Sequence, residues 1–259
     1  MKMFSYDQIA AIYDDDMGKN VSDKDIAFYV QQCSAAQAPI LELGCGTGRI
    51  TLPLVKAGLE VVGIDVSLPM LQQLQRKATE QLSEVEAKRL HYAQMDMSRL
   101  AFEAQFAFIL CPYSALIYLV DKTPEALAKI RAHLGPNGLF ILDIFVPSPR
   151  VISLPDDYLF HDYQRELADG TVLKRTKTIQ KTALPNINII TRHYYLLDKA
   201  GNLQRTITTQ SRIQCYFPNE LKALLEQNHF EVLKILGDFE DLQCDDNSQM
   251  AVFICRAAE

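Results

Sequence analysis

The chain has 259 residues, of which 48% are hydrophobic and 22% charged, and it carries a formal net charge of −6. These values are typical of one large globular domain, and the acidic balance argues against a nucleic-acid enzyme, which usually presents a basic face to phosphates. The first residues contain no apolar run of signal length, so we expect a cytoplasmic protein that is neither exported nor inserted in a membrane.

The six cysteines are spread along the chain, with no C-x-x-C pair and no cluster of Cys and His. We therefore expect no metal site. Cys45 lies in a glycine-rich segment and Cys255 in an apolar one, which suits reduced thiols in a cytoplasm.

Residues 1–35 are expected to form helices that act as a lid over a binding site. Tyr6 and Tyr13 could contact a cationic ligand through their ring faces, and three consecutive acids, 14–16, follow the second tyrosine. The alternative is a helix that packs its tyrosines against the core.

The most informative segment is a glycine-rich turn after an apolar strand. Ile40–Leu43 is followed by Gly44, Gly46 and Gly48, and then by apolar residues at helical spacing over 49–58. Strand, glycine turn and helix are typical of a doubly wound α/β fold, in which ligands bind at the carboxyl ends of the strands. Glycine permits the sharp turn and lets a ligand lie against the main chain.

The spacing of these glycines favours S-adenosylmethionine over a dinucleotide. A dinucleotide fingerprint, G-x-G-x-x-G, would need its third glycine at the position of Arg49. Glu42, two residues before the first glycine, is awkward beside a diphosphate but can favour the ammonium and sulfonium of S-adenosylmethionine. A dinucleotide-dependent oxidoreductase is therefore the weaker alternative.

The next strand and helix add a second acid to the same edge of the predicted sheet. Val61–Asp65 is an apolar strand, and the carboxylate of Asp65 can accept hydrogen bonds from both hydroxyls of a ribose. Ser67 can cap the following helix, with Pro69 in its first turn.

Two further strands complete the first half of the sheet. The strand predicted over 91–97 carries Asp96, which could accept a hydrogen bond from the amine of adenine while Met97 contacts the ring. Phe106–Cys111 is wholly apolar, as expected for a parallel strand buried on both faces. A helix over 126–134, a turn at 135–138 and a fifth strand that ends near residue 145 continue the pattern.

The second half predicts a small antiparallel sheet inserted into the first. Residues 158–181 alternate in β-fashion about Asp169-Gly170, and 187–197 and 203–217 do so about 198–202. We expect three or four strands here. A helix from 218 to about 227 and strands over 230–235 and 251–255 close the chain.

These elements predict two structural units. Residues 1–150 and 216–259 would form the ligand-binding core, and residues 151–215 an inserted sheet that serves as a substrate lid or a dimer surface. One basic concentration lies in this insertion, and we interpret it as the solvated face of a strand. It consists of Lys174, Arg175, Lys177 and Lys181.

In order and spacing, the motifs resemble those of the class I S-adenosylmethionine-dependent methyltransferases. The resemblance rests on the segment from Glu42 to Gly48, on Asp65 and on Asp96. It implies a doubly wound, seven-stranded Rossmann-like sheet with S-adenosylmethionine as cofactor and S-adenosylhomocysteine as product. It also implies that Glu42 and the glycine turn hold the methionine part, Asp65 the ribose and Asp96 the adenine. With its insertion, the chain is loosely similar to bacterial sugar-amine and natural-product N-methyltransferases.

The cofactor-binding residues that we predict lie along the edge of the core sheet and in the amino-terminal lid. They are Tyr13, Glu42, Gly44, Cys45, Gly46, Gly48, Asp65, Val66, Met70, Asp96, Met97 and Cys111. Candidates from the core that would meet a substrate are Cys111, Pro112, Tyr113, Ser114, Asp143 and Phe145.

The expected reaction is methyl transfer to a small molecule, with an amine nitrogen as the leading acceptor because a neutral amine needs no strong base. The catalytic candidates are Asp143 and, on an inserted strand, His193 and Tyr195; Arg192 and Tyr194 should face the opposite way. The alternatives are O-methylation of a phenol or a carboxylate, or a catalytically silent S-adenosylmethionine-binding partner subunit. A homodimer through the inserted sheet is also open.

Overall fold

A computed structural model describes residues 5–17 and 23–258. Its core is a seven-stranded sheet in the order β10-β11-β5-β4-β1-β2-β3. The strands are β1 (Ile40–Leu43), β2 (Val61–Asp65), β3 (Leu90–Gln94), β4 (Phe106–Cys111), β5 (Leu134–Phe145), β10 (Phe230–Leu236) and β11 (Met250–Ala257). The first five pair in parallel, and β11 joins β5 and β10 antiparallel. The chain reverses its order between β1 and β4, which is where ligands bind in such sheets.

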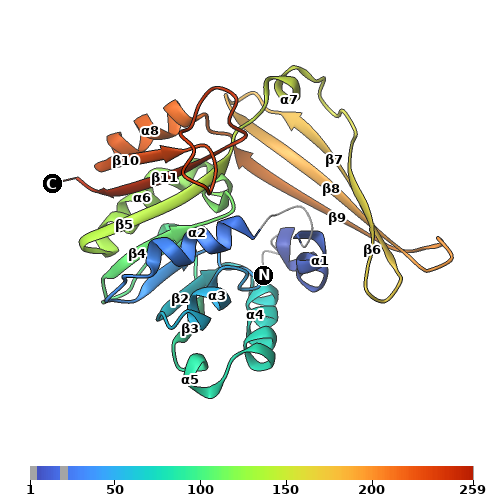
Figure 1. Cartoon of the computed structure of the whole chain (residues 1–259). Coiled ribbons are helices and arrows are strands. Elements are labelled where there is room, and N and C mark those ends of the chain that lie inside the picture. The colour runs from blue at the N-terminus through green and yellow to red at the C-terminus, as the bar shows by residue number, and fades with distance from the viewer. Residues whose placement is uncertain (1–4, 18–22, 259) are drawn as a thin grey trace.

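Helices cover both faces of the core sheet, as the apolar strands require (Figure 1). On one face, α2 (Lys24–Cys33) and α3 (Thr51–Lys56) pack against alternate strand residues such as Ile40 and Leu110. On the other face, α6 (Thr123–His133) and α8 (Pro218–Gln227) pack against the intervening residues. The doubly wound fold predicted from the sequence is confirmed.

The remaining helices and turns connect or flank these layers. They are the helices α1 (Tyr13–Met17), α4 (Leu68–Gln81), α5 (Glu84–Ala87) and α7 (Pro149–Ser153), and the 3-10 turns η1 (Ser5–Gln8), η2 (Ala10–Ile12), η3 (Met97–Arg99), η4 (Ala115–Tyr118) and η5 (Val120–Lys122). Ser67 caps α4 through a hydrogen bond from the Met70 amide, as its place in the sequence predicts.

The insertion forms a four-stranded antiparallel sheet, in the order β6-β7-β8-β9. Its strands are β6 (Phe160–Glu166), β7 (Val172–Lys181), β8 (Ile187–Leu197) and β9 (Leu203–Gln214). Figure 1 shows this sheet extending to one side of the core, with α1 in the space between the two sheets. Both predicted hairpins are present.

Two boundaries differ from the sequence prediction. Residues 135–138, predicted as a turn, belong to β5, where Asn137 takes a left-handed φ of 59° and the pairing with β4 shifts register. The third strand ends at Gln94 rather than near Asp96, because Asp96 caps η3 by accepting a hydrogen bond from the Ser98 amide. A glycine-rich turn and a bulge share the same residue preferences, which is why the sequence did not separate them.

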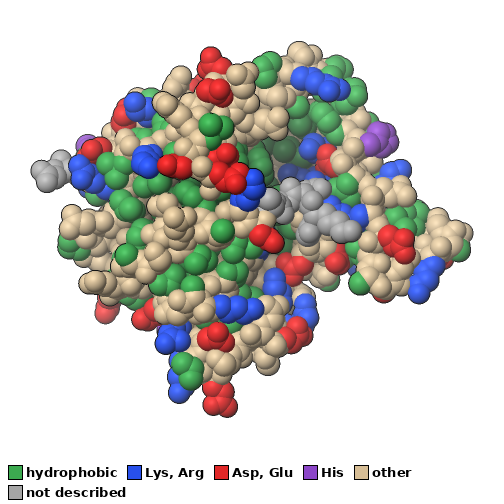
Figure 2. All heavy atoms as spheres, viewed as in Figure 1, with side chains coloured by type: hydrophobic (Ala, Val, Ile, Leu, Met, Phe, Trp, Pro, Cys, Tyr) green, Lys and Arg blue, Asp and Glu red, His purple; other side chains and the backbone are tan. Residues whose placement is uncertain are grey.

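The surface seen in Figure 2 mixes Lys and Arg with Asp and Glu side chains and is hollowed between the core and the inserted sheet. Within residues 5–17 and 23–258, no helix is both long and apolar enough to cross a membrane. The same residues contain no group of three side chains placed to hold a metal ion.

Candidate active site

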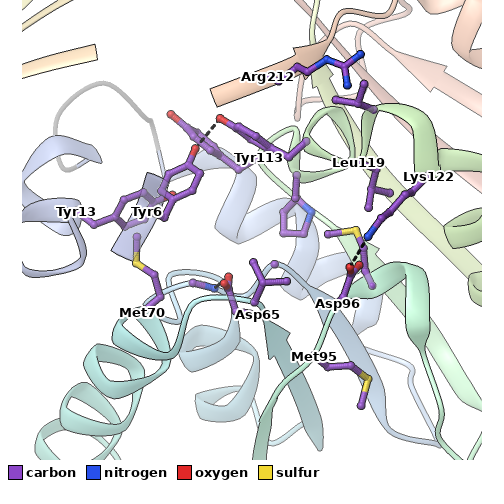
Figure 3. Close-up of a pocket in the computed structure, with 18 of the residues that line it drawn as sticks. Tyr6, Tyr13, Asp65, Met70, Met95, Asp96, Tyr113, Leu119, Lys122 and Arg212 are labelled. Atoms are coloured by element: carbon purple, nitrogen blue, oxygen red, sulfur yellow. Dashed lines mark hydrogen bonds and ion pairs between the residues drawn. The ribbon is translucent and has the colours of Figure 1, made fainter. Parts of the chain in front are cut away.

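A cavity of about 530 Å³ lies at the carboxyl ends of β1 to β4, where the strand order reverses. We call it the first cavity. The turns after the four strands supply Gly44 and Gly46, Asp65 and Val66, Met95 to Met97, and Pro112, Tyr113 and Ala115. Tyr6 and Tyr13 from the amino-terminal segment and Met70 from α4 complete the wall on one side, as Figure 3 shows.

The glycine turn presents bare main chain to the first cavity. Gly44 and Gly46 have φ angles of 71° and 55°, in the left-handed region where other residues are strained. A Cβ on Gly44 would lie 3.1 Å from the Cβ of Ala115, whereas a Cβ on Gly46 would meet nothing nearer than the Gly44 carbonyl oxygen at 4.0 Å. The backbone at Gly46 therefore borders open space, which a ligand can approach closely.

Asp65 ties the turn after β1 to the turn after β2. One carboxylate oxygen accepts a hydrogen bond from the Gly46 amide at 2.9 Å, and the other accepts one from the Ser67 amide at 2.8 Å. Burial raises the pKa of Asp65, and these two amides partly oppose that rise. The side chain is thus fixed at the edge of the cavity, and its remaining lone pairs are available to hydroxyl donors.

Asp96 lies along the same edge of the cavity as Asp65, on the side of Lys122 (Figure 3). Partial burial would raise its pKa, but hydrogen bonds from Ser98 and the ion pair with Lys122 at 3.0 Å lower the pKa below its usual value. The carboxylate therefore stays ionised. Met70, Met95 and Met97 add apolar surface to the wall of the cavity, and a flat ring with polar groups at both ends fits such a wall.

Four predicted cofactor residues lie outside the lining of the first cavity: Glu42, Cys45, Gly48 and Cys111. Gly48 packs so closely against α4 that a Cβ at this position would lie only 2.2 Å from the Cδ1 of Leu74. The Cys45 side chain packs over Gly63, where a Cβ would lie 2.9 Å from its Sγ. Cys111 is fully buried, and burial raises the pKa of its thiol well above the usual value.

Glu42 is buried beneath the glycine turn with 2% of its surface exposed. The Thr51 hydroxyl donates a hydrogen bond to its carboxyl at 2.5 Å, and burial raises the pKa of Glu42 to about 8. At neutral pH the carboxyl group of Glu42 therefore carries a proton. From the sequence, a charged carboxylate is expected at this position. A strand-end acid looks the same in the sequence whether it faces the ligand or the core.

The amino-terminal segment is joined to the glycine turn by charged hydrogen bonds. Asp14 accepts a hydrogen bond from the Thr47 hydroxyl at 2.6 Å and pairs with Lys77 of α4 at 3.0 Å. Asp7 accepts one from the Ser67 hydroxyl at 2.6 Å. These contacts hold Tyr6 and Tyr13 over the cavity.

A second cavity, of about 620 Å³, lies between the core and the inserted sheet. One face of β7 and β8 forms its wall on the inserted side, and the segments 113–118 and 145–152 form its wall on the core side. Asp16 and Met17 of α1 reach it from the amino-terminal segment. Figure 2 shows hydrophobic and basic side chains in this hollow.

Four tyrosines line both cavities: Tyr6, Tyr13, Tyr113 and Tyr118. The hydroxyls of Tyr6 and Tyr118 lie 2.6 Å apart, and the Tyr6 ring meets the rings of Tyr13 and Tyr118 edge to face. Burial raises the pKa of Tyr6 and of Tyr13 well above the usual value, so both stay neutral. We call these four residues the tyrosine doorway, because they separate one cavity from the other.

The inserted strand β8 presents the opposite face to the one favoured from the sequence. Arg192 and Tyr194 line the second cavity, whereas His193 and Tyr195 lie on the other face, where the His193 Nδ1 is 2.9 Å from the Thr208 hydroxyl. Strand alternation separates the two pairs but does not say which of them faces inward. Arg192, and not His193, can therefore contact a ligand in the second cavity.

Asp143 does not line either cavity. It is 2% exposed, and its oxygens accept hydrogen bonds from the Tyr29 hydroxyl at 2.7 Å and from the amides of Tyr113 and Ser114 at 2.8 and 3.1 Å. Both amides belong to residues with left-handed φ angles of 56° and 55°, a costly conformation outside glycine. Burial raises the pKa of Asp143 to about 6. The structure thus gives it a positioning role for Tyr113, in place of the expected contact with substrate.

Part of the basic concentration on β7 also lines the second cavity, contrary to the sequence interpretation. Arg175, Lys177 and Lys181 share one face with Ile179 and face inward. Their spacing of two is a signal that could have placed them on one side of a strand. The sequence does not show which face of β7 lies toward the core, and this becomes visible only in the folded structure.

The sequence is similar to known methyltransferases. Residues 40–138 match the family described as a methyltransferase domain. The putative methyltransferase YqeM of Bacillus subtilis (strain 168) is 27% identical over 166 residues, which are 63% of this chain and 64% of that protein. The chain therefore spans slightly less than two thirds of the length of this relative.

Two solved structures extend the likeness to the whole chain. The CcbJ methyltransferase of Streptomyces caelestis is 25% identical, and the alignment covers all of both chains with a TM-score of 0.79. CalS10 of Micromonospora echinaspora, an amino pentose methyltransferase with bound S-adenosylmethionine, gives a TM-score of 0.69 at 20% identity over 100% of this chain and 98% of that chain. The second likeness is one of fold.

Proposed function

We propose that this chain, which belongs to the class I S-adenosylmethionine-dependent methyltransferases, methylates an amine nitrogen of a small molecule held in the second cavity. S-adenosylmethionine, the cofactor of this family, supplies the methyl group when bound in the first cavity. The observation that carries the proposal is the tyrosine doorway, which puts one thin wall of side chains between the two cavities.

The first cavity has a suitable group for each part of the cofactor. Asp65 would accept hydrogen bonds from the ribose hydroxyls, and Asp96 one from the adenine amine, with Met70 and Met97 against the ring. The open backbone at Gly46 would take the methionine part. The faces of Tyr6 and Tyr13 would attract the sulfonium through cation–π contacts of roughly 0.5–2 kcal/mol.

The residues that line the two cavities favour an acceptor group that can be methylated without a general base. Among the described residues that line the two cavities there is no histidine. Asp16, the acid of the second cavity, pairs with Arg175 through both its oxygens at 2.7 and 2.8 Å. A neutral amine can attack a methyl group directly, so positioning by the doorway would be enough. A phenol would have to lose its proton, and among the described residues that line the second cavity the one carboxylate, Asp16, is already bound by Arg175.

Transfer of labelled methyl tests the proposal. Purified protein with methyl-labelled S-adenosylmethionine should label small amines, among them amino sugars, to give products whose label survives alkali. A carboxyl ester would instead release the label as methanol, and labelled phenyl ethers would indicate a phenol acceptor. Either result would contradict N-methylation.

The Asp65→Ala variant is the control for a contaminating activity, because labelling must fall with its cofactor affinity. If S-adenosylhomocysteine binds the parent but no acceptor in a metabolite extract becomes labelled, the chain is a binding subunit and the proposed catalysis is wrong.

A further inference from the structure

The wall of the second cavity contains a pair of cations directly opposite each other. On β7 and β8, Lys177 is the cross-strand partner of Arg192, and both side chains line the cavity. Like charges in directly opposite positions destabilise a sheet. A negatively charged group beside the two cations would offset this repulsion.

The acids near this pair are engaged by Lys177 itself and by Arg175. Asp162 accepts from Lys177 and from Arg175, both at 2.9 Å, and Asp16 binds Arg175. Arg192, among the described residues, makes no ion pair with an Asp or Glu. Arg175 and Lys177 thus share these two carboxylates, and the guanidinium of Arg192 has no acidic partner among the described residues.

Arg192 is held by neutral groups. Its guanidinium bonds to the hydroxyl of Tyr118 and lies in the field of Tyr6 and Tyr194, all of which line the second cavity. A partly buried guanidinium with phenol partners retains N–H donors that are arranged as a fork, and such a fork matches the two oxygens of a carboxylate or a phosphate. Its position beside Tyr118 puts these donors next to the doorway.

The wall becomes apolar further along the same strands. The next inward-facing pair is Ile179 opposite Ile190, about 7 Å from the cationic pair at two residues per step. At the mouth of the cavity, Phe145, Ile152 and Leu184 are 51%, 45% and 49% exposed. One end of the cavity therefore suits an anion and the other an apolar group.

We propose that Arg192, assisted by Lys177, binds an anionic group of the acceptor, a carboxylate or a phosphate ester, while the apolar body of the acceptor extends toward Ile190 and the mouth. This rests on the proposed function, because it assigns the second cavity to the acceptor. Arg192 positions the acceptor and takes no part in bond making.

The test uses the 259-residue chain saturated with S-adenosylhomocysteine and three probes of similar shape: benzoate, phenyl phosphate and neutral benzyl alcohol. By calorimetry, at least one anion should bind at least tenfold more tightly than benzyl alcohol. A preference for phenyl phosphate identifies a phosphate ester as the natural group, and a preference for benzoate identifies a carboxylate. Equal affinity for all three probes would overturn the proposal.

Two variants separate this role from a structural one. Arg192→Gln should lose at least tenfold in anion affinity, keep its affinity for S-adenosylhomocysteine, and melt at the same or a higher temperature because a partly buried cation without an acidic partner is removed. Arg205→Gln, at an exposed position of β9 outside both cavities, should change none of these. A lower melting temperature of Arg192→Gln with unchanged anion affinity would show that Arg192 only supports the sheet.

The binding measurements distinguish a failure of the proposed function from a failure of the role assigned to Arg192. If S-adenosylhomocysteine does not bind the parent protein, the first cavity has been misassigned and the proposed function fails. If it binds and anions are not preferred, only the assignment of Arg192 fails.

Discussion

The two cavities of this protein are built in different ways. The first cavity is lined largely by turns that follow directly on β1 to β4, so Gly46, Asp65 and Asp96 are each placed by the strand just before them. The second cavity is formed mainly where the inserted sheet faces the core, and its lining residues run from Tyr6 to Phe217. The difference shows that a site made by strand ends can be seen in a local motif, whereas a site made between two sheets depends on which faces meet.

Gly46→Val is the change with the largest expected effect on the first cavity. The added side chain would project into the space that borders the open backbone, and it would also strain a left-handed φ of 55°. We expect the affinity for S-adenosylhomocysteine to fall at least about a hundredfold in calorimetry.

Gly58→Ala is the matched control for Gly46→Val. Gly58 has a φ of 89°, and an added Cβ would meet nothing within 4 Å, so this variant carries backbone strain without obstructing a ligand. Its affinity should equal that of the parent. A similar loss of affinity in both variants would mean that strain, and not the ligand space, sets the effect.

Asp143→Asn tests how the doorway is held. The native pKa of about 6 lies above the usual 3.8, so the folded protein binds more protons than the unfolded chain between these values. The wild type therefore loses stability relative to the variant as the pH rises from about 4 to 7, by ~3 kcal/mol. Urea unfolding across this range should show the change, and a difference that does not vary with pH would contradict it.

Asp65→Ala should weaken the binding of S-adenosylhomocysteine about tenfold to a hundredfold. A carboxylate that accepts hydrogen bonds from a ribose contributes roughly 1.5–3 kcal/mol. The Asp96→Ala variant, at the other end of the cavity, gives a comparison in which the adenine end loses its acceptor. If Asp65→Ala binds like the parent, the ribose lies elsewhere.

Glu42→Gln should have the smallest effect, and it sharpens the comparison between motif and structure. Because the pKa of Glu42 is raised to about 8, Gln resembles the protonated group present at pH 7 and can still accept the hydrogen bond from Thr51. We expect affinity for the cofactor to change by less than about threefold. A tenfold loss at pH 7 would restore the role that the sequence motif suggested, a charged carboxylate acting on the methionine part.

The sequence was a good guide to the fold and to the first cavity for the same reason. Alternating apolar strands, the glycines at 44 and 46 and the acids Asp65 and Asp96 are local features, and the fold places them on the cavity wall. Glu42 shows the limit, because its sequence position is compatible with either a ligand or a core environment, and only the contact with Thr51 distinguishes them.

The second cavity could not be derived in this way. Alternation along β8 separates Arg192 from His193 but leaves the inward face undetermined until the sheet is docked on the core. The role of Asp143 was equally hidden, because it acts on Tyr113 from a strand thirty positions away. The division into a core and an inserted lid stays a proposal that the variants of Arg192 would support.

The most direct measurement of the central claim is a calorimetric titration of the wild-type protein with S-adenosylhomocysteine, S-adenosylmethionine and NAD. Our account predicts saturable binding of both adenosyl ligands at one site per chain, lost in Gly46→Val and retained in Gly58→Ala, and no binding of NAD. Binding of NAD in the absence of any binding of the two adenosyl ligands would contradict the account.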